Sequence, residues 1–249
     1  MTSASLLPSL NSKTDIELRL AGYISFAIPF ISAAVFSIRK ATRKYGLRVT
    51  PPGPFFAIWG LIYLNFFIAS TYALVTDAWL PSSWLLYTAW NVMVGGWTLF
   101  FSTATRTGVA VSTVFIIGTL LSMEALWADL VSTGSLDGFM GVYTHNTFAL
   151  CVGWLCAACN LAVGIVMVYI FGVSYDHQLV AFWLLTPLTY EVFFYKHFTT
   201  AHFTSSLGLL FTAAYACTGA AIGSLKPWPR QEQQPAMEEP SKEAERCEE

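Results

Sequence analysis

The sequence predicts an all-α integral membrane protein, a bundle of seven transmembrane helices. Of its 249 residues, 55% are hydrophobic and only 11% are charged, whereas soluble domains carry about 25% charged residues. Long stretches lack charge at neutral pH, as between Gly138 and Tyr175, and about 20 apolar residues match a bilayer core of about 30 Å. Strict alternation of apolar and polar residues is absent, so we do not expect a β-barrel.

Seven apolar stretches of suitable length follow one another with short connections, so we expect one helical domain, 18–225. We place the spans at 18–38, 54–76, 82–103, 107–129, 146–171, 178–197 and 204–225. The first span is the weakest, because Arg19 lies near its start and Pro29 interrupts its middle. Residues 1–17 form an N-terminal segment outside the membrane. The tail, 226–249, is acidic and poor in apolar residues, and we expect it to be disordered.

The first connection is strongly basic and predicts the orientation. It holds five cations, which are Arg39, Lys40, Arg43, Lys44 and Arg48. The loops around 77–81 and 130–145 contain no Lys or Arg. The positive-inside rule then places the 39–51 segment in the cytosol, the N-terminus outside and the C-terminus inside.

The second span opens with three prolines within residues 50–63, which read TPPGPFFAIWGLIY. Proline lacks an N–H and restricts the residue before it, so we expect a loop that enters a helix near residue 54. Phe56, Trp59 and Tyr63 are spaced i, i+3 and i+7, and this spacing puts them on one face of the helix. The segment therefore predicts both a membrane helix and a possible binding surface.

Spans four and six each contain a carboxylate, Glu124 and Glu191. Carboxylates inside a membrane are costly and are candidates for function. Both lie near the outer ends of their spans, so interfacial solvation or a structural hydrogen bond is the alternative explanation.

Spans five and seven carry faces of small residues that allow close helix contacts. On span five the face comprises Gly153, Cys156, Ala157, Asn160 and Gly164. On span seven, Gly219 and Gly223 have GxxxG spacing. Such faces mediate either packing within the bundle or formation of a homodimer.

Motifs that would indicate an enzyme or a cofactor site are absent from the sequence. It has no GxGxxG or GxxxxGK[ST] phosphate loop, no GxSxG serine and no HExxH pattern. Three of the five cysteines lie within span five, and we expect packing there and no disulfide framework. We therefore expect a non-enzymatic protein without cofactor, metal or nucleic acid.

The stretch 50–63 resembles the opening of the second helix in the TspO/translocator protein (tryptophan-rich sensory protein) family. The matching residues are Thr50, Pro51, Phe56, Ile58, Trp59, Gly60, Ile62 and Tyr63. Looser similarity extends to the third helix of that family through Asn91, Trp97, Phe100 and Phe101, and to its fifth helix through Gly153, Trp154, Ala158 and Asn160. The resemblance covers a five-helix core at about 18–171, and the last two spans lie outside it.

The resemblance implies a pocket between the helices that takes a flat apolar ligand such as a porphyrin or a sterol, with the proline loop as its cap. The residues implied to line it are Phe56, Trp59, Tyr63, Trp90, Asn91, Trp97 and Trp154. Aromatic walls suit such ligands, although packing or an interfacial belt also explains each residue alone. A tryptophan that the family carries beside the double proline is missing here, as is a cation soon after Tyr169.

These observations leave three functional hypotheses. The first is a membrane protein that binds or transports a flat hydrophobic small molecule. The second is a carboxylate-dependent transporter that uses Glu124 and Glu191. The third is a structural subunit of a larger membrane complex, whose aromatic and small-residue faces serve as interfaces. In all three the protein is surrounded by membrane lipid.

Overall fold

The computed structural model of the chain describes residues 12–36, 38–136, 138–200 and 207–225, and every regular element within these ranges is helical. The predicted tail, 226–249, and most of the N-terminal segment lie outside the described residues. The elements are α1 (Ser12–Ser25), α2 (Ala27–Val35), α3 (Arg39–Tyr45), the 3-10 helix η1 (Gly53–Ala57), α4 (Ile58–Thr76), α5 (Pro81–Ser102), α6 (Arg106–Ser132), α7 (Gly138–Tyr169), α8 (Tyr175–Thr200) and α9 (Leu207–Ser224).

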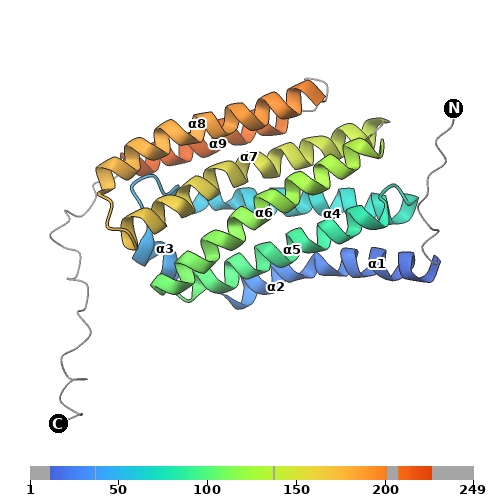
Figure 1. Cartoon of the computed structure of the whole chain (residues 1–249), viewed down its shortest axis with the longest axis horizontal. Coiled ribbons are helices and arrows are strands. Elements are labelled where there is room, and N and C mark those ends of the chain that lie inside the picture. The colour runs from blue at the N-terminus through green and yellow to red at the C-terminus, as the bar shows by residue number, and fades with distance from the viewer. Residues whose placement is uncertain (1–11, 37, 137, 201–206, 226–249) are drawn as a thin grey trace, which may run out of the picture.

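The long helices lie side by side in one elongated bundle (Figure 1). Within the described residues, four helical stretches are long and apolar enough to cross a membrane. They are Gly53–Thr76, Arg106–Ser132, Gly138–Tyr169 and Leu207–Ser224. Beside them lie α5, α8 and the α1–α2 pair, at the positions of the other predicted spans. The prediction of a helical membrane bundle is confirmed. The start of α1 and the end of α9 lie at opposite ends of the bundle (Figure 1), as an odd number of passes requires.

The first span is divided at Phe26, between α1 and α2. Pro29 has no N–H to donate to the carbonyl of Ser25, four residues earlier, so the α-helical ladder is interrupted there. At the same place the Phe26 N–H donates to the carbonyl of Tyr23, three residues earlier, at 3.2 Å, and this i to i−3 bond makes a tighter turn than an α-helical one. At this break, the rings of Tyr23 and Phe26 pack against the ring of Phe67 in α4.

Two regions differ from the sequence prediction. The fifth span was expected from residue 146, but α7 begins at Gly138, because the expected loop residues Thr144 and His145 are buried against the bundle. The basic 39–51 segment was expected to be a loop, but it begins with α3 and folds back into the bundle. Its apolar residues Ala41 and Tyr45 are buried while its lysines stay exposed, so packing and not helix propensity defines α3.

The small-residue face of α7 is where α8 and α9 approach most closely. A Cβ on Gly153 would meet the Thr212 side chain of α9, and one on Gly164 would lie 2.6 Å from Gln178 Nε2 of α8. Asn160 on the same face donates to Thr186 Oγ1 of α8 at 3.2 Å. The last two helices are therefore packed tightly onto the five-helix core.

Candidate functional site

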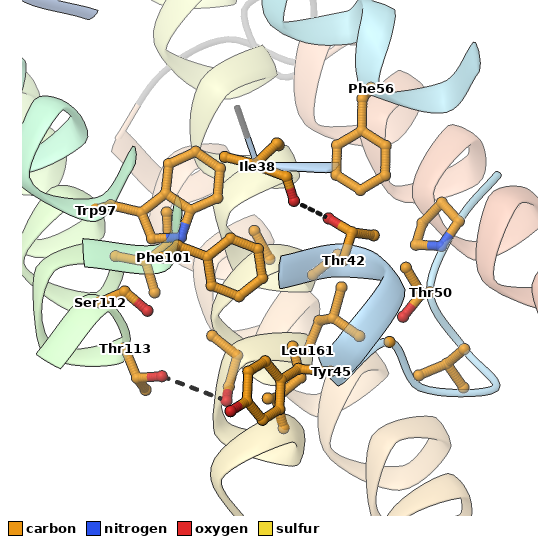
Figure 2. Close-up of a pocket in the computed structure, with 18 of the residues that line it drawn as sticks. Ile38, Thr42, Tyr45, Thr50, Phe56, Trp97, Phe101, Ser112, Thr113 and Leu161 are labelled. Atoms are coloured by element: carbon orange, nitrogen blue, oxygen red, sulfur yellow. Dashed lines mark hydrogen bonds between the residues drawn. The ribbon is translucent and has the colours of Figure 1, made fainter. Parts of the chain in front are cut away.

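An aromatic cavity, drawn in Figure 2, lies beside α3, which Figure 1 shows at one end of the bundle. Its walls come from α4, α5, α6 and α7, and α3 together with residues 46–51 covers one side. The helices beyond the five-helix core also contribute, through Phe182 of α8 and through Ala216 and Ala220 of α9. The cavity is therefore lined by residues from every described helix after α2.

Four of the seven predicted ligand residues line this cavity, namely Phe56, Trp59, Trp97 and Trp154. The rings of Trp59 and Trp97 are stacked with centroids 5.8 Å apart. Trp154 meets both Phe56 and Trp59 edge to face, at 6.0 Å and 6.5 Å. These stacked and edge-to-face rings form one continuous aromatic wall, a surface suited to contact with a flat apolar molecule.

The other three predicted residues do not line the cavity. Tyr63 stacks on Trp59 at 5.6 Å and points toward Phe30 of α2. Trp90 and Asn91 are fully buried deeper in the bundle, where the Asn91 amide donates to the Tyr87 carbonyl and to Ser25 Oγ, both at 3.0 Å. Tyr63 supports Trp59 from behind, and ligand contact by all three residues stays a prediction.

Several lining residues were not predicted, among them Tyr45, Phe101, Ser112 and Thr113 (Figure 2). Phe101 stacks on Trp97 at 6.1 Å, and its i+4 spacing from Trp97 was a signal that the sequence carried. Tyr45 gave no such signal, because it lies within the basic segment and is buried only through folding of α3.

The polar groups of the wall are mostly satisfied by the backbone. Ser112 Oγ and Thr113 Oγ1 donate to the Val109 carbonyl at 2.8 Å and 3.0 Å. Thr42 Oγ1 donates to the Ile38 carbonyl at 2.9 Å. Among the described lining residues none is charged. The described wall is therefore apolar and aromatic, and the Thr42, Ser112 and Thr113 hydroxyls in it donate to backbone carbonyls.

Residues 46–55, which we term the cover segment, close the cavity and are attached to α7 and α8. The Tyr169 hydroxyl donates to the Gly46 carbonyl at 3.0 Å. Arg48 pairs with Asp176 at the start of α8, at 3.3 Å. The Leu47 N–H donates to Thr50 Oγ1 at 2.7 Å and fixes the turn before the prolines.

Helix α9 packs directly against the cover segment. Its Gly223 lies so close that a Cβ there would be 2.6 Å from the Thr50 carbonyl oxygen, and a Cβ on Gly219 would be 2.6 Å from the Phe55 ring. The Tyr215 ring packs on Phe55 at 4.8 Å. The GxxxG glycines thus pack within the chain, so this motif does not argue for a homodimer.

The two predicted membrane carboxylates are in different environments. Glu124 is buried and pairs with Lys196 of α8 at 2.5 Å, and the ammonium of Lys196 lies 5.1 Å from the Trp127 ring centroid. Glu191 is exposed on the outer side of α8. Glu124 follows Ile116 of the cavity wall by eight residues, about 12 Å along the helix. The carboxylates therefore do not form one site with each other or with the cavity.

The histidines and cysteines do not assemble a metal site within the described parts of the chain. The Trp127 indole N–H donates to His145 Nδ1 at 3.3 Å. The cysteines at 151, 156, 159 and 217 are all free thiols. Cys247 and His202 lie outside the described residues.

The bundle and its aromatic cavity define a helical membrane protein of the TspO type. The family model described as TSPO-like protein matches residues 20–207, and the chain belongs to this family. The match includes α8, so the expectation that the last two spans both lie outside the resemblance is wrong for the sixth span. No curated protein and no solved structure matches the chain. The matched segment ends where α9 begins.

Proposed function

We propose that this membrane protein binds, and passes across or along the bilayer, a flat hydrophobic small molecule of the porphyrin, sterol or similar lipid type. The observation that carries the proposal is the meeting of Phe56, Trp59, Trp97 and Trp154 around one cavity whose described lining residues carry no charge. Such walls bind planar apolar molecules through ring contact and apolar burial. The absence of a recognisable catalytic motif in the sequence supports a non-enzymatic role.

A direct test uses a porphyrin dimethyl ester added to the purified protein in lipid nanodiscs. We expect saturable quenching of tryptophan fluorescence. Trp59→Ala removes one stacked wall and is expected to weaken binding about tenfold, since the loss of such a ring contact is worth about 1–2 kcal/mol. Leu64→Ala is the matched control, because Leu64 lies on the same helix with 56% of its surface exposed to the surroundings. Quenching that does not saturate, or equal effects of both variants, would contradict the proposal.

The orientation is part of the same proposal, with α3 and the cover segment on the cytosolic side. The exposed cations of the 39–51 segment support it through the positive-inside rule. A membrane-impermeant maleimide added to intact cells should label a cysteine placed at Leu80, in the α4–α5 loop, and should leave one at Lys40 unlabelled. The background variant carries Cys247→Ser. The reverse labelling pattern would invert the topology.

The carboxylate-dependent transport hypothesis receives less support than ligand binding. It requires two carboxylates that exchange protons along one path, whereas Glu124 is paired with Lys196 and Glu191 is exposed on another face. We therefore keep the aromatic cavity as the proposed functional site.

A further inference from the structure

Helix α3 presents one face to the cavity and the opposite face to its surroundings. The residues of α3 and its N-terminal cap that line the cavity are Ile38, Thr42 and Tyr45 (Figure 2). Successive residues of an α-helix are rotated by about 100°, so these three side chains project in nearly one direction. The positions between them project the opposite way, and they hold three exposed cations, Lys40, Arg43 and Lys44. We term these three residues the cationic face.

No carboxylate of the described parts of the chain neutralises the cationic face, because none of its three side chains forms an ion pair there. The Asp176 carboxylate at the start of α8 is already paired with Arg48. The Lys44 ammonium lies over the Tyr45 ring, 5.3 Å from its centroid, and this contact supplies no counter-ion. The face therefore keeps its full positive charge.

This crowding of cations opposes the helix that carries it. Lys40 lies three and four positions before Arg43 and Lys44, the spacings at which side chains of a helix meet and like charges repel. The helix dipole favours cations in the last turn, which helps Arg43 and Lys44 but not Lys40. A helix of seven residues is also too short to be stable alone in water. An anionic surface against this face would replace repulsion by attraction, so the arrangement favours an anionic partner.

The place of α3 in the chain favours a membrane surface as that partner. Residues 46–52 join α3 directly to Gly53–Thr76, a helical stretch long and apolar enough to cross a membrane. The cations therefore lie near the point where the chain enters the bilayer, which is the level of the lipid headgroups. Each Lys or Arg near an anionic leaflet strengthens its attraction about fivefold.

We propose that the cationic face binds the headgroups of anionic phospholipids, and that this contact holds α3 and the cover segment against the cavity. The three cations face the lipid together only while α3 is helical and packed on the cavity. Anionic lipid binds that arrangement more tightly and shifts the population toward it. Because α3 also supplies part of the cavity wall, the lipid composition controls how often the cavity opens at this end. Lipid binding of this kind does not depend on which ligand the cavity takes.

The test is hydrogen–deuterium exchange of the full chain in nanodiscs, read at the backbone amides of 40–50 without added ligand. Discs of phosphatidylcholine are compared with discs made of equal parts of phosphatidylcholine and phosphatidylserine. Phosphatidylserine is expected to slow exchange at these amides at least tenfold, since three cations at about fivefold each set an upper bound of about a hundredfold. The slowing is expected to shrink in high salt, which screens exposed charges.

Two triple variants isolate the charge. Replacing Lys40, Arg43 and Lys44 by glutamine keeps the helix propensity nearly unchanged and is expected to abolish the slowing. The matched control, Lys40→Arg with Arg43→Lys and Lys44→Arg, keeps every charge and is expected to retain it. The amides of 77–81, a loop without Lys or Arg at the other end of α4, report any general effect of an acidic lipid surface on exchange.

Four outcomes would overturn the proposal. The first is equal exchange at 40–50 in the two kinds of disc, and the second is slowing that persists in the glutamine variant. The third is slowing by inorganic phosphate alone in phosphatidylcholine discs, which would make the face a site for a soluble anion. The fourth is an effect of phosphatidylserine that requires the glutamates of 226–249 to be replaced by glutamine, which would show that the acidic tail occupies the face. Porphyrin binding is measured separately, so its failure would leave these outcomes unchanged.

Discussion

The contact between α9 and the cover segment can be tested with a single methyl group. In Gly223→Ala the added Cβ would lie 2.6 Å from the Thr50 carbonyl oxygen and 3.0 Å from that of Arg48. Both are backbone atoms, so relief of the clash requires the cover segment or the helix to shift. Overpacking of this kind costs about 1–3 kcal/mol.

The matched control is Gly60→Ala on α4, where nothing lies within 4 Å of the new Cβ. Both substitutions gain the helix propensity of alanine over glycine, up to about 1 kcal/mol. Their difference therefore isolates the clash, and we expect Gly223→Ala to be less stable than Gly60→Ala by about 1–3 kcal/mol. Gly219→Ala should fall between them, because it meets the Phe55 ring, which can tilt away.

The assay is SDS-induced unfolding of the protein in mixed micelles, followed by far-ultraviolet circular dichroism. Dissociation of the porphyrin diester is measured in parallel, and it should be faster in Gly223→Ala because the displaced cover segment leaves the cavity less closed. If Gly223→Ala matches or exceeds the stability of Gly60→Ala, the cover segment does not rest on α9 as the structure describes.

Three further predictions use the same unfolding or binding assays. Lys196→Met leaves the Glu124 carboxylate without its ammonium and should cost about 1–3 kcal/mol, less than a fully buried pair because Lys196 is 44% exposed; adding Glu124→Gln should recover part of this, and no recovery would contradict the pairing. Asn160→Ala should cost about 0.5–1.5 kcal/mol by removing its bonds to two threonines of α8, and an unchanged midpoint would refute it. Ala220→Leu fills the cavity wall and should weaken diester binding severalfold, whereas Ala221→Leu, on the exposed side of α9, should not; equal affinities would remove α9 from the site.

The sequence carried enough information to predict the bundle and the aromatic face. Apolar stretches and prolines predicted the helix that begins at residues 53–58, and the stripe of Phe56 and Trp59 lies on the cavity as the spacing implied. The small residues of the fifth span predicted a close helix contact, which α8 and α9 make. These features depend on local periodicity, and periodicity is visible in one sequence.

Depth within the bundle could not be predicted in the same way. Trp90 and Trp97 share a helix face, but seven residues separate them by about 10.5 Å along the axis. Only Trp97 reaches the cavity, while Trp90 lies fully buried between α5 and α4, with its ring 4.8 Å from Phe66. The position of a cavity along a bundle depends on which loop folds over its end, and that is a long-range property.

Long-range pairing explains the remaining differences. Glu124 and Lys196 are 72 positions apart, and only the packing of α8 onto the bundle brings them together. The same holds for α3, whose buried residues share one apolar cluster with residues of α5, α7 and α8. A basic segment alone indicates topology, and the sequence does not show that its apolar residues cover a cavity.

The arrangement of α9 has a consequence for the site as a whole. In a five-helix core the cover segment would keep its hydrogen bond with the Tyr169 hydroxyl of α7 and would lose its contacts with α8 and α9. Here Gly219 and Gly223 bring α9 against the same segment, and Ala216 and Ala220 extend the cavity wall. Movement of the cover segment must therefore separate it from α9 as well as from the Tyr169 hydroxyl and the Arg48–Asp176 pair. Opening of the cavity at this end is accordingly coupled to the packing of a helix that lies beyond the family-matched segment.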